Sequence, residues 1–159
     1  MSERFDDQRS RQGSSLQEGF LDFDLAEEKF ATPGHLREIK QGLDDQSLPI
    51  REQAQEIKER LLEAYKRGGV VIVKAGTGTG KTVCMPGIIR EVLRELGLPD
   101  RQIISEPRKD AATGAAMAIA AMQGETLGRG VGFSTSEGRA LTRNAAVGVV
   151  TPGIFLRYL

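Results

Sequence analysis

The most restrictive feature of the sequence is a run of β-branched residues that leads into a glycine-rich turn. Val70–Val73 is followed by Ala-Gly-Thr-Gly-Thr-Gly-Lys-Thr at residues 75–82. An uninterrupted β-branched run is typical of a strand buried on both faces, and a helix is predicted from the Lys-Thr pair to about Leu96. Gly97 ends that helix, and Pro99 prevents it from resuming. A strand, a glycine turn and a helix in this order predict an α/β fold.

The turn has the composition of a loop that binds phosphate groups. Glycine permits unusual dihedral angles and lets phosphate oxygens approach the backbone, while the loop N–H groups and the helix N-terminus favour an anion. We therefore predict a site for the phosphates of ATP with magnesium. The predicted contacts come from Gly76, Thr77, Gly78, Thr79, Gly80, Lys81 and Thr82.

Two side chains at the end of the turn have separate predicted roles. Lys81 supplies a positive charge for the outer phosphates, and the Thr82 hydroxyl supplies a ligand for Mg²⁺. Ala75 stands where the usual pattern has glycine, and alanine is small enough to be tolerated. The competing interpretation is a Gly/Thr turn that binds nothing. The preceding strand, the following helix and the Gly-Lys-Thr ending favour the phosphate loop.

The rest of the chain alternates between short apolar runs and helical patterns. Strands are predicted at 103–105, 131–133 and 145–150, and helices at 50–67, at 110–123 and from residue 154 onward. Strands alternating with helices imply βαβ crossovers, so the predicted fold class is α/β with a largely parallel sheet and flanking helices.

The N-terminal region differs in composition from the remainder. Residues 1–48 hold eleven acidic and six basic side chains, whereas residues 49–159 hold eleven acidic and sixteen basic ones. We predict disorder for residues 1–17, which are polar and lack periodicity. Apolar positions between Phe20 and Ile39 indicate either a helical extension, broken at Pro33-Gly34, or a partner-binding arm. The expected organisation is an extension at 1–46 and a nucleotide-binding domain at 47–159.

Residue counts narrow the class of protein further. The single cysteine, Cys84, cannot form a disulfide within the chain, and the single histidine, His35, cannot build a metal cluster. The sequence has neither an apolar run long enough for a membrane span nor the apolar core of a secretory signal. We expect a cytoplasmic protein that is not attached to a membrane.

Four segments together resemble one protein family. Residues 76–86, 103–112, 127–133 and 150–157 resemble, in order, four conserved stretches of the DEAH/RHA-type superfamily 2 helicases. The resemblance covers about residues 47–159 and implies a RecA-like P-loop NTPase fold that is incomplete. It also implies ATP and magnesium at the glycine turn. The family property implied for the whole motor is ATP hydrolysis coupled to movement along, or unwinding of, RNA or DNA.

The resemblance assigns a second group of residues to nucleic acid. By their positions in the motifs, Arg108, Lys109 and Thr151 would bind the phosphate backbone of a single strand, RNA more than DNA. Read without the resemblance, Arg108 is an ordinary surface charge and Thr151 a helix N-cap. The sequence departs from the family at Glu106, where Gln is usual, and after Phe133, where an Arg-Phe pair that helps to split strands is replaced.

The largest departure concerns catalysis. The family's Asp-Glu-x-His motif, whose carboxylates hold magnesium and activate water, occurs nowhere in the sequence, so no catalytic residues are assigned. We expect an N-terminal piece of a longer helicase that requires the remainder of the helicase core, is inactive alone and leaves an apolar edge at Val70–Val73. The alternatives are a non-catalytic nucleotide-binding module or truncated remnant and, less favoured, a small P-loop kinase.

Overall fold

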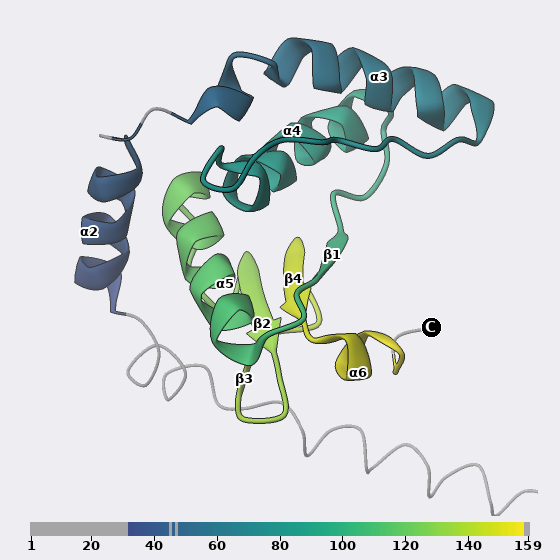
Figure 1. Cartoon of the computed structure of the whole chain (residues 1–159). Helices are drawn as coiled ribbons and strands as arrows, with labels where there is room; N and C mark the ends of the chain where they lie inside the picture. Colours follow the sequence, from purple (N-terminus) through teal and green to yellow (C-terminus); the bar gives the residue numbers. More distant parts are fainter. Residues whose placement is uncertain (1–31, 45, 47, 158–159) are drawn as a thin grey trace, which may run out of the picture.

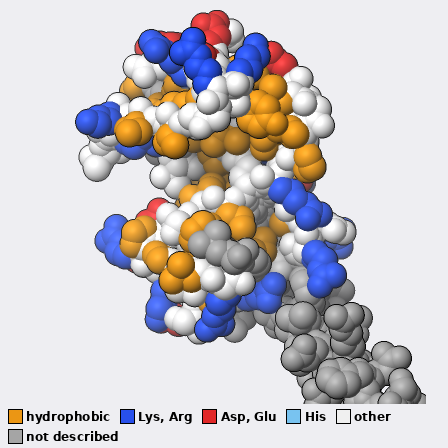
Figure 2. All heavy atoms as spheres, turned by 90° about the vertical axis from the view of Figure 1, so that its right-hand side faces the viewer, with side chains coloured by type: hydrophobic (Ala, Val, Ile, Leu, Met, Phe, Trp, Pro, Cys, Tyr) orange, Lys and Arg blue, Asp and Glu red, His pale blue; other side chains and the backbone are white. Residues whose placement is uncertain are grey.

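The computed structural model describes residues 32–44, 46 and 48–157. Figure 1 shows two parts, a helical part above and a sheet part below, and Figure 2 shows them as two lobes separated by a notch. The helical part contains the 3₁₀ turn η1 (Pro49–Arg51), α3 (Ala54–Arg67) and α4 (Lys81–Glu95). The sheet part contains four strands, α5 (Lys109–Gln123) and α6 (Pro152–Phe155), with α2 (Pro33–Asp44) outside α5.

The sheet confirms the predicted fold class. Its strands are β1 (Gln102–Ser105), β2 (Val131–Ser134), β3 (Arg139–Ala140) and β4 (Val147–Val150), in the order β1-β4-β2-β3. β4 lies between β1 and β2 and is parallel to both, while β3 pairs antiparallel with β2. Three of these strands were predicted from apolar runs. The fourth, β3, was not predicted because a strand of two residues carries no period-2 signal.

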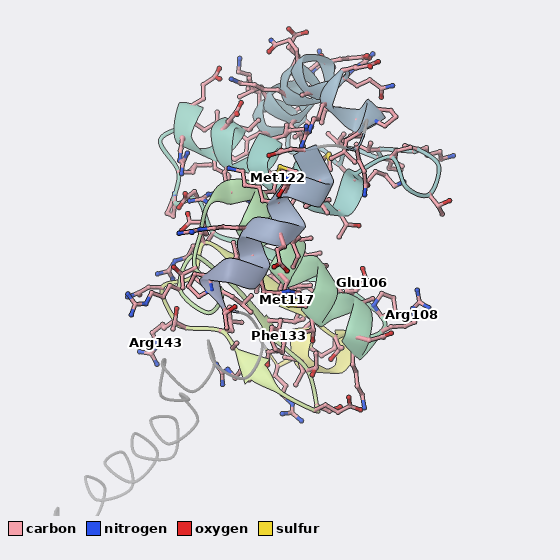
Figure 3. The ribbon with its side chains drawn as sticks, turned by 90° about the vertical axis from the view of Figure 1, so that its left-hand side faces the viewer. Glu106, Arg108, Met117, Met122, Phe133 and Arg143 are labelled. Carbon is pink, nitrogen blue, oxygen red and sulfur yellow. The ribbon has the colours of Figure 1, made fainter. Side chains whose placement is uncertain are left out.

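The core of the sheet part lies between α5 and one face of the sheet. Small and β-branched side chains of α5 pack against apolar side chains of the strands. The cluster consists of Ala112, Ala116, Ile119 and Ala120 from α5, of Val131, Phe133, Ala140, Val147 and Val149 from the strands, and of Leu127. The alanines let the helix backbone come close to the sheet. Figure 3 shows Met117 of α5 beside Phe133 of β2, in agreement with the packing of Met117 on this cluster.

An ionic cluster joins the helical part to the sheet part. The Arg90 guanidinium of α4 donates to Asp100 at 3.0 Å, to Gln123 at 2.5 Å and to Glu125 at 3.0 Å. The hydrogen bond from Arg90 lowers the pKa of Asp100 below its ordinary value. Because Gln123 ends α5, this one side chain holds the middle of α4 against the C-terminal end of α5.

The predicted strand at Val70–Val73 is wrong. After the left-handed Gly68 cap of α3, with φ of 68°, the chain runs extended beneath α3 without pairing to any described strand. Val70 is 88% exposed and Ile72 78% exposed, whereas Val73 packs against the cluster of Ile50 and neighbouring residues. A β-branched run becomes a buried strand only when strands pair with both of its edges, and here α3 supplies cover from one direction alone.

The helix α2 begins at Pro33, where the sequence analysis predicted that a helix would break. Pro33-Gly34 does not break a helix but opens one, since proline is well suited to the first helical position, where its missing N–H is not needed. α2 packs on α5, and Leu36 contacts the core of the sheet part. The predicted disorder of residues 1–17 lies outside the described residues. No described helix combines the length and apolar character that a membrane span requires.

Candidate nucleotide and nucleic-acid sites

The glycine loop, residues 75–82, has the backbone that its sequence predicts. Gly78 and Gly80 have φ of 77° and 86°, a region that other residues rarely adopt, and α4 begins at once with Lys81. The η1 turn holds the loop from one side, because the Ile50 N–H donates to the Thr79 carbonyl at 3.2 Å. A Cβ atom on Gly80 would lie 3.1 Å from the Leu48 side chain, so the loop passes close to a buried leucine.

The Lys81 side chain turns back over the glycine loop. Its ammonium lies 2.6 Å from the Ala75 carbonyl oxygen and 2.5 Å from that of Gly76. The Thr79 hydroxyl also donates to the Gly76 carbonyl, at 3.0 Å. These contacts place a positive charge inside the curve of the loop, next to the N-terminus of a helix of 15 residues. The arrangement is suited to an anion with several oxygens.

Few described residues could bind magnesium. Thr82 is exposed in the first turn of α4, so its hydroxyl is accessible to an ion held by bound phosphates. Among the described residues, no group of three or more His, Cys, Asp or Glu side chains could hold a metal ion. The residues present therefore fit magnesium only as a companion of a phosphate ligand, with Thr82 as the protein hydroxyl.

The three predicted nucleic-acid residues meet at one edge of the sheet. Arg108 and Lys109 follow β1, and Thr151 follows β4; because Ser105 is paired with Val150 in parallel register, the segments leave the sheet together. The Glu106 N–H donates to the Val150 carbonyl at 2.8 Å and extends this pairing. We call this place, formed by Arg108, Lys109 and Thr151, the carboxyl edge.

Each side chain of the carboxyl edge has a different local environment. Arg108 is exposed, and Figure 3 shows it beside Glu106 at the start of α5. The Lys109 ammonium lies 2.6 Å from the Glu137 carboxylate in the turn between β2 and β3. Thr151 is the N-cap of α6, but its side chain makes no capping hydrogen bond, so the hydroxyl remains available for another acceptor or donor. The edge thus presents one exposed guanidinium, one ammonium paired with a carboxylate, and one hydroxyl.

The structure does not bring the glycine loop and the carboxyl edge together. The loop is held by Ile50, while its neighbour Arg51 donates to the Met122 sulfur near the C-terminal end of α5. Arg108 lies at the opposite end of the same helix, and the fourteen residue steps from Arg108 to Met122 span roughly 20 Å. The separation follows from Val70–Val73: only a strand within the parallel sheet would deliver the loop to the carboxyl ends of the other strands.

Sequence reasoning did not find the clamp formed by Leu48 and Ile50 around the glycine loop. The sequence evidence for this clamp is weak because both residues precede a helix and resemble ordinary core positions. Their spacing to the loop, about thirty residues, has no local pattern that would reveal the contact.

Comparison with known proteins identifies the relatives of the chain. No known family profile matches it, but individual helicases do. The ATP-dependent RNA helicase TDRD9 of Danio rerio is 32% identical over 112 residues, which cover 70% of this chain and 8% of that protein. The ATP-dependent RNA helicase DEAH13 of Arabidopsis thaliana is 32% identical over 109 residues, covering 64% of this chain and 8% of the relative. The ATP-dependent RNA helicase DHX30 of Homo sapiens is 32% identical over 105 residues, covering 64% of this chain and 9% of the relative.

This chain is homologous to the DEAH-box ATP-dependent RNA helicases. The homology confirms the family resemblance found in the four sequence motifs. The α/β fold, with its mostly parallel sheet and flanking helices, is consistent with a fragment of a RecA-like helicase domain. The chain spans less than a tenth of the length of these helicases.

Proposed function

We propose that this chain is the ATP-binding segment of an ATP-dependent RNA helicase motor. The observation that carries the proposal is the glycine loop, in which left-handed Gly78 and Gly80 precede a helix and the Lys81 ammonium lies within the curve of the loop. Loop amides and Lys81 would bind the phosphates of ATP, and Thr82 would hold magnesium beside them. The RNA helicase homologues support ATP as the nucleotide.

In the same proposal, the carboxyl edge contacts single-stranded RNA. Arg108 would form a forked contact with a phosphate, and the Thr151 hydroxyl would donate to a neighbouring phosphate. Lys109 would bind a phosphate of the RNA only after its ion pair with the Glu137 carboxylate is broken. These groups position a strand without reading its bases, which suits a motor that acts on many sequences.

The proposed domain is residues 47–159, with residues 1–46 as an extension. The domain would receive the remainder of the helicase core along two open surfaces, the outer edge of β1 and the exposed run Val70–Val73. β1 pairs with β4 on one side only among the described strands, and Val70 and Ile72 expose most of their surface. Strands added there would draw the glycine loop toward the carboxyl edge, so that ATP and RNA occupy adjacent positions.

Catalysis is proposed to belong to the assembled motor. Phosphoryl transfer depends on a group that positions the attacking water and on charges around the transferred phosphate. The sequence has no Asp-Glu-x-His motif to supply the carboxylates. We therefore propose that the chain alone binds Mg-ATP without measurable turnover.

The decisive test for nucleotide binding compares two lysines a few residues apart. Lys81→Ala removes the ammonium inside the loop, while Lys74→Ala removes an exposed ammonium just before the loop and serves as the matched control. Titration with a fluorescent ATP analogue and magnesium should show about tenfold or greater weakening for K81A, since a charge-assisted contact contributes roughly 1.5–3 kcal/mol. Equal affinities for K81A and K74A would remove the basis for an ATP site.

RNA binding needs its own comparison. We expect Arg108→Ala to weaken binding of a labelled single-stranded RNA about threefold to tenfold and to reduce the salt dependence of binding, because one phosphate contact is lost. Arg37→Ala, an exposed arginine of α2, is the control. Retention of both the affinity and the salt slope in R108A would show that the carboxyl edge does not bind the strand.

A further inference from the structure

The ion pair between Lys109 and Glu137 lies at the carboxyl edge, outside the core of the sheet part. The Lys109 ammonium is 2.6 Å from the Glu137 carboxylate, and the two side chains are 47% and 72% exposed. Exposed ion pairs of this kind contribute little to the stability of a fold, because water already solvates both charges. The main consequence of the pair therefore concerns what Lys109 can bind.

The turn that carries Glu137 is held in one shape by Thr135. The Thr135 hydroxyl accepts hydrogen bonds from the N–H groups of Glu137 and Gly138, each at 3.2 Å, and donates to the Gly138 carbonyl at 3.2 Å. The Thr135 N–H also donates to the Gly138 carbonyl, at 2.9 Å. Thr135 is only 8% exposed and directly follows β2, so the network is anchored on the sheet. The Glu137 carboxylate thus reaches Lys109 from a fixed backbone position.

Lys109 is equally well fixed, because it is the first residue of α5. The first turn of a helix leaves N–H groups without partners in the helix, and the Arg108 N-cap makes no side-chain hydrogen bond to them. The helix N-terminus and the ammonium both favour an anion. Figure 1 shows the turn between β2 and β3 and the start of α5 at the same end of the sheet part. The Glu137 carboxylate is the anion that the fold brings there.

Acidic side chains outnumber basic ones around the carboxyl edge. Residues 106–110 hold two acidic and two basic side chains, and Glu137 raises the number of acidic ones to three. Within this described group, Glu137 is the acid that forms an ion pair with a base of the edge. A nucleic-acid strand that approaches the edge therefore meets repulsion as well as attraction.

A phosphate and the Glu137 carboxylate are alternative partners of Lys109. Both are oxyanions that accept charge-assisted hydrogen bonds from an ammonium. The lysine ammonium is a compact charge without the planar fork of arginine, so it does not require one fixed geometry of its partner. Because both side chains of the pair are accessible to solvent, a phosphate can displace the carboxylate without disturbing the core.

We propose that Glu137 is an internal competitor of the RNA phosphate for Lys109, and that the turn between β2 and β3 thereby limits the strength of RNA binding. The competitor role rests on the proposed RNA contact of the carboxyl edge. A strand that binds Lys109 must displace the carboxylate, so one ion pair is lost for each one gained. The strand is then held weakly at this point and is readily released, as movement along a strand requires.

The first test removes the charge of the competitor in the full chain. Glu137→Gln keeps the size of the side chain, and it should tighten binding of a labelled oligouridine about threefold to fivefold and steepen its salt dependence. The matched control is Glu63→Gln on α3, which breaks an ion pair of 2.8 Å with Arg67 and changes the net charge equally. E63Q should change the affinity by less than about 1.5-fold, because salt screens distant charges.

A double-mutant cycle with Lys109 separates competition from repulsion. In the unaltered chain, Lys109→Ala should weaken binding less than about twofold, because the ammonium is already paired. In the E137Q chain, the same substitution should remove the gain of about threefold or more. If E137Q tightens binding equally with and without Lys109, its effect is general repulsion from the turn, and the competitor role is refuted.

Arg108→Ala distinguishes failure of the competitor role from failure of the RNA site. If R108A weakens binding while E137Q leaves it unchanged, the RNA contact stands and the competitor role alone is wrong. Equal tightening by E137Q and E63Q has the same meaning, because it reflects net charge alone. If R108A changes nothing in either the unaltered or the E137Q chain, the carboxyl edge does not bind the strand, and both proposals fail.

Discussion

The contact between Gly80 and Leu48 provides a quantitative test of how the glycine loop is held. Gly80→Ala places a methyl group on a residue with φ of 86°, 3.1 Å from two carbon atoms of Leu48. The left-handed backbone alone costs roughly 1–2 kcal/mol for a residue with a Cβ. Displacing a leucine that is only 6% exposed adds about 1 kcal/mol. The free energy of unfolding is expected to fall by about 2–3 kcal/mol in total.

The matched control is Gly68→Ala. Gly68 also has a left-handed φ, of 68°, but a Cβ there meets nothing within 4 Å. This variant should therefore lose only the backbone part, about 1–2 kcal/mol. At about 3 °C per kcal/mol for a chain of this size, thermal melting followed by circular dichroism should separate the two variants by about 3 °C.

Leu48→Ala completes the cycle and isolates the contact. In the L48A background, Gly80→Ala should cost no more than Gly68→Ala, because the methyl group no longer meets the leucine. Equal losses for G80A and G68A in the unaltered background would refute the clamp of η1 on the glycine loop. A G80A penalty that persists undiminished with L48A would place the strain elsewhere in the loop.

Two further predictions concern the exposed run and the ionic cluster. Val70 and Ile72 are 88% and 78% exposed, so the double variant Val70→Thr/Ile72→Thr should bind less of a hydrophobic dye and associate less, with little change in melting temperature. Unchanged dye fluorescence would contradict the exposure of these side chains. Arg90 lowers the pKa of Asp100 in the folded chain. The ionised carboxylate therefore stabilises the fold at pH values above its unfolded pKa of about 4, and this contribution is lost as the pH falls through the lower pKa of the folded state. Asp100→Asn should remove this part of the acid dependence, and a D100N melting profile parallel to that of the unaltered chain between about pH 3 and pH 7 would contradict it.

Much of the fold follows from local sequence patterns. The runs that become β1, β2 and β4 and the helical pattern of α5 were recognisable because the apolar period and length of each segment indicate its type. The left-handed glycines of the loop were also predictable, since their φ values depend on the residue type itself.

The wrong prediction of a strand at Val70–Val73, and with it the expected position of the glycine loop, has a different physical cause. Val70–Val73 has the composition of a buried strand, but pairing depends on neighbouring strands, and composition carries no information about them. The placement of the loop near Met122, rather than near Arg108, follows from this same segment. The convergence of Arg108 and Thr151, in contrast, follows from the parallel pairing of β1 with β4. The alternating pattern predicted a largely parallel sheet, but it did not predict which strands are neighbours.

The way the two parts are joined has a consequence for partial unfolding. Most contacts of the strands and α5 close within residues 102–150, whereas the helical part meets the sheet part through the packing of α4 on α5 and the reach of Arg90 to Asp100, Gln123 and Glu125. Segments with few buried apolar side chains open first, and Ile57 is the one buried residue of α3. We therefore expect α3 and the glycine loop to separate while the sheet part stays folded, so the capacity to hold a nucleotide is the first property that the chain loses on partial unfolding.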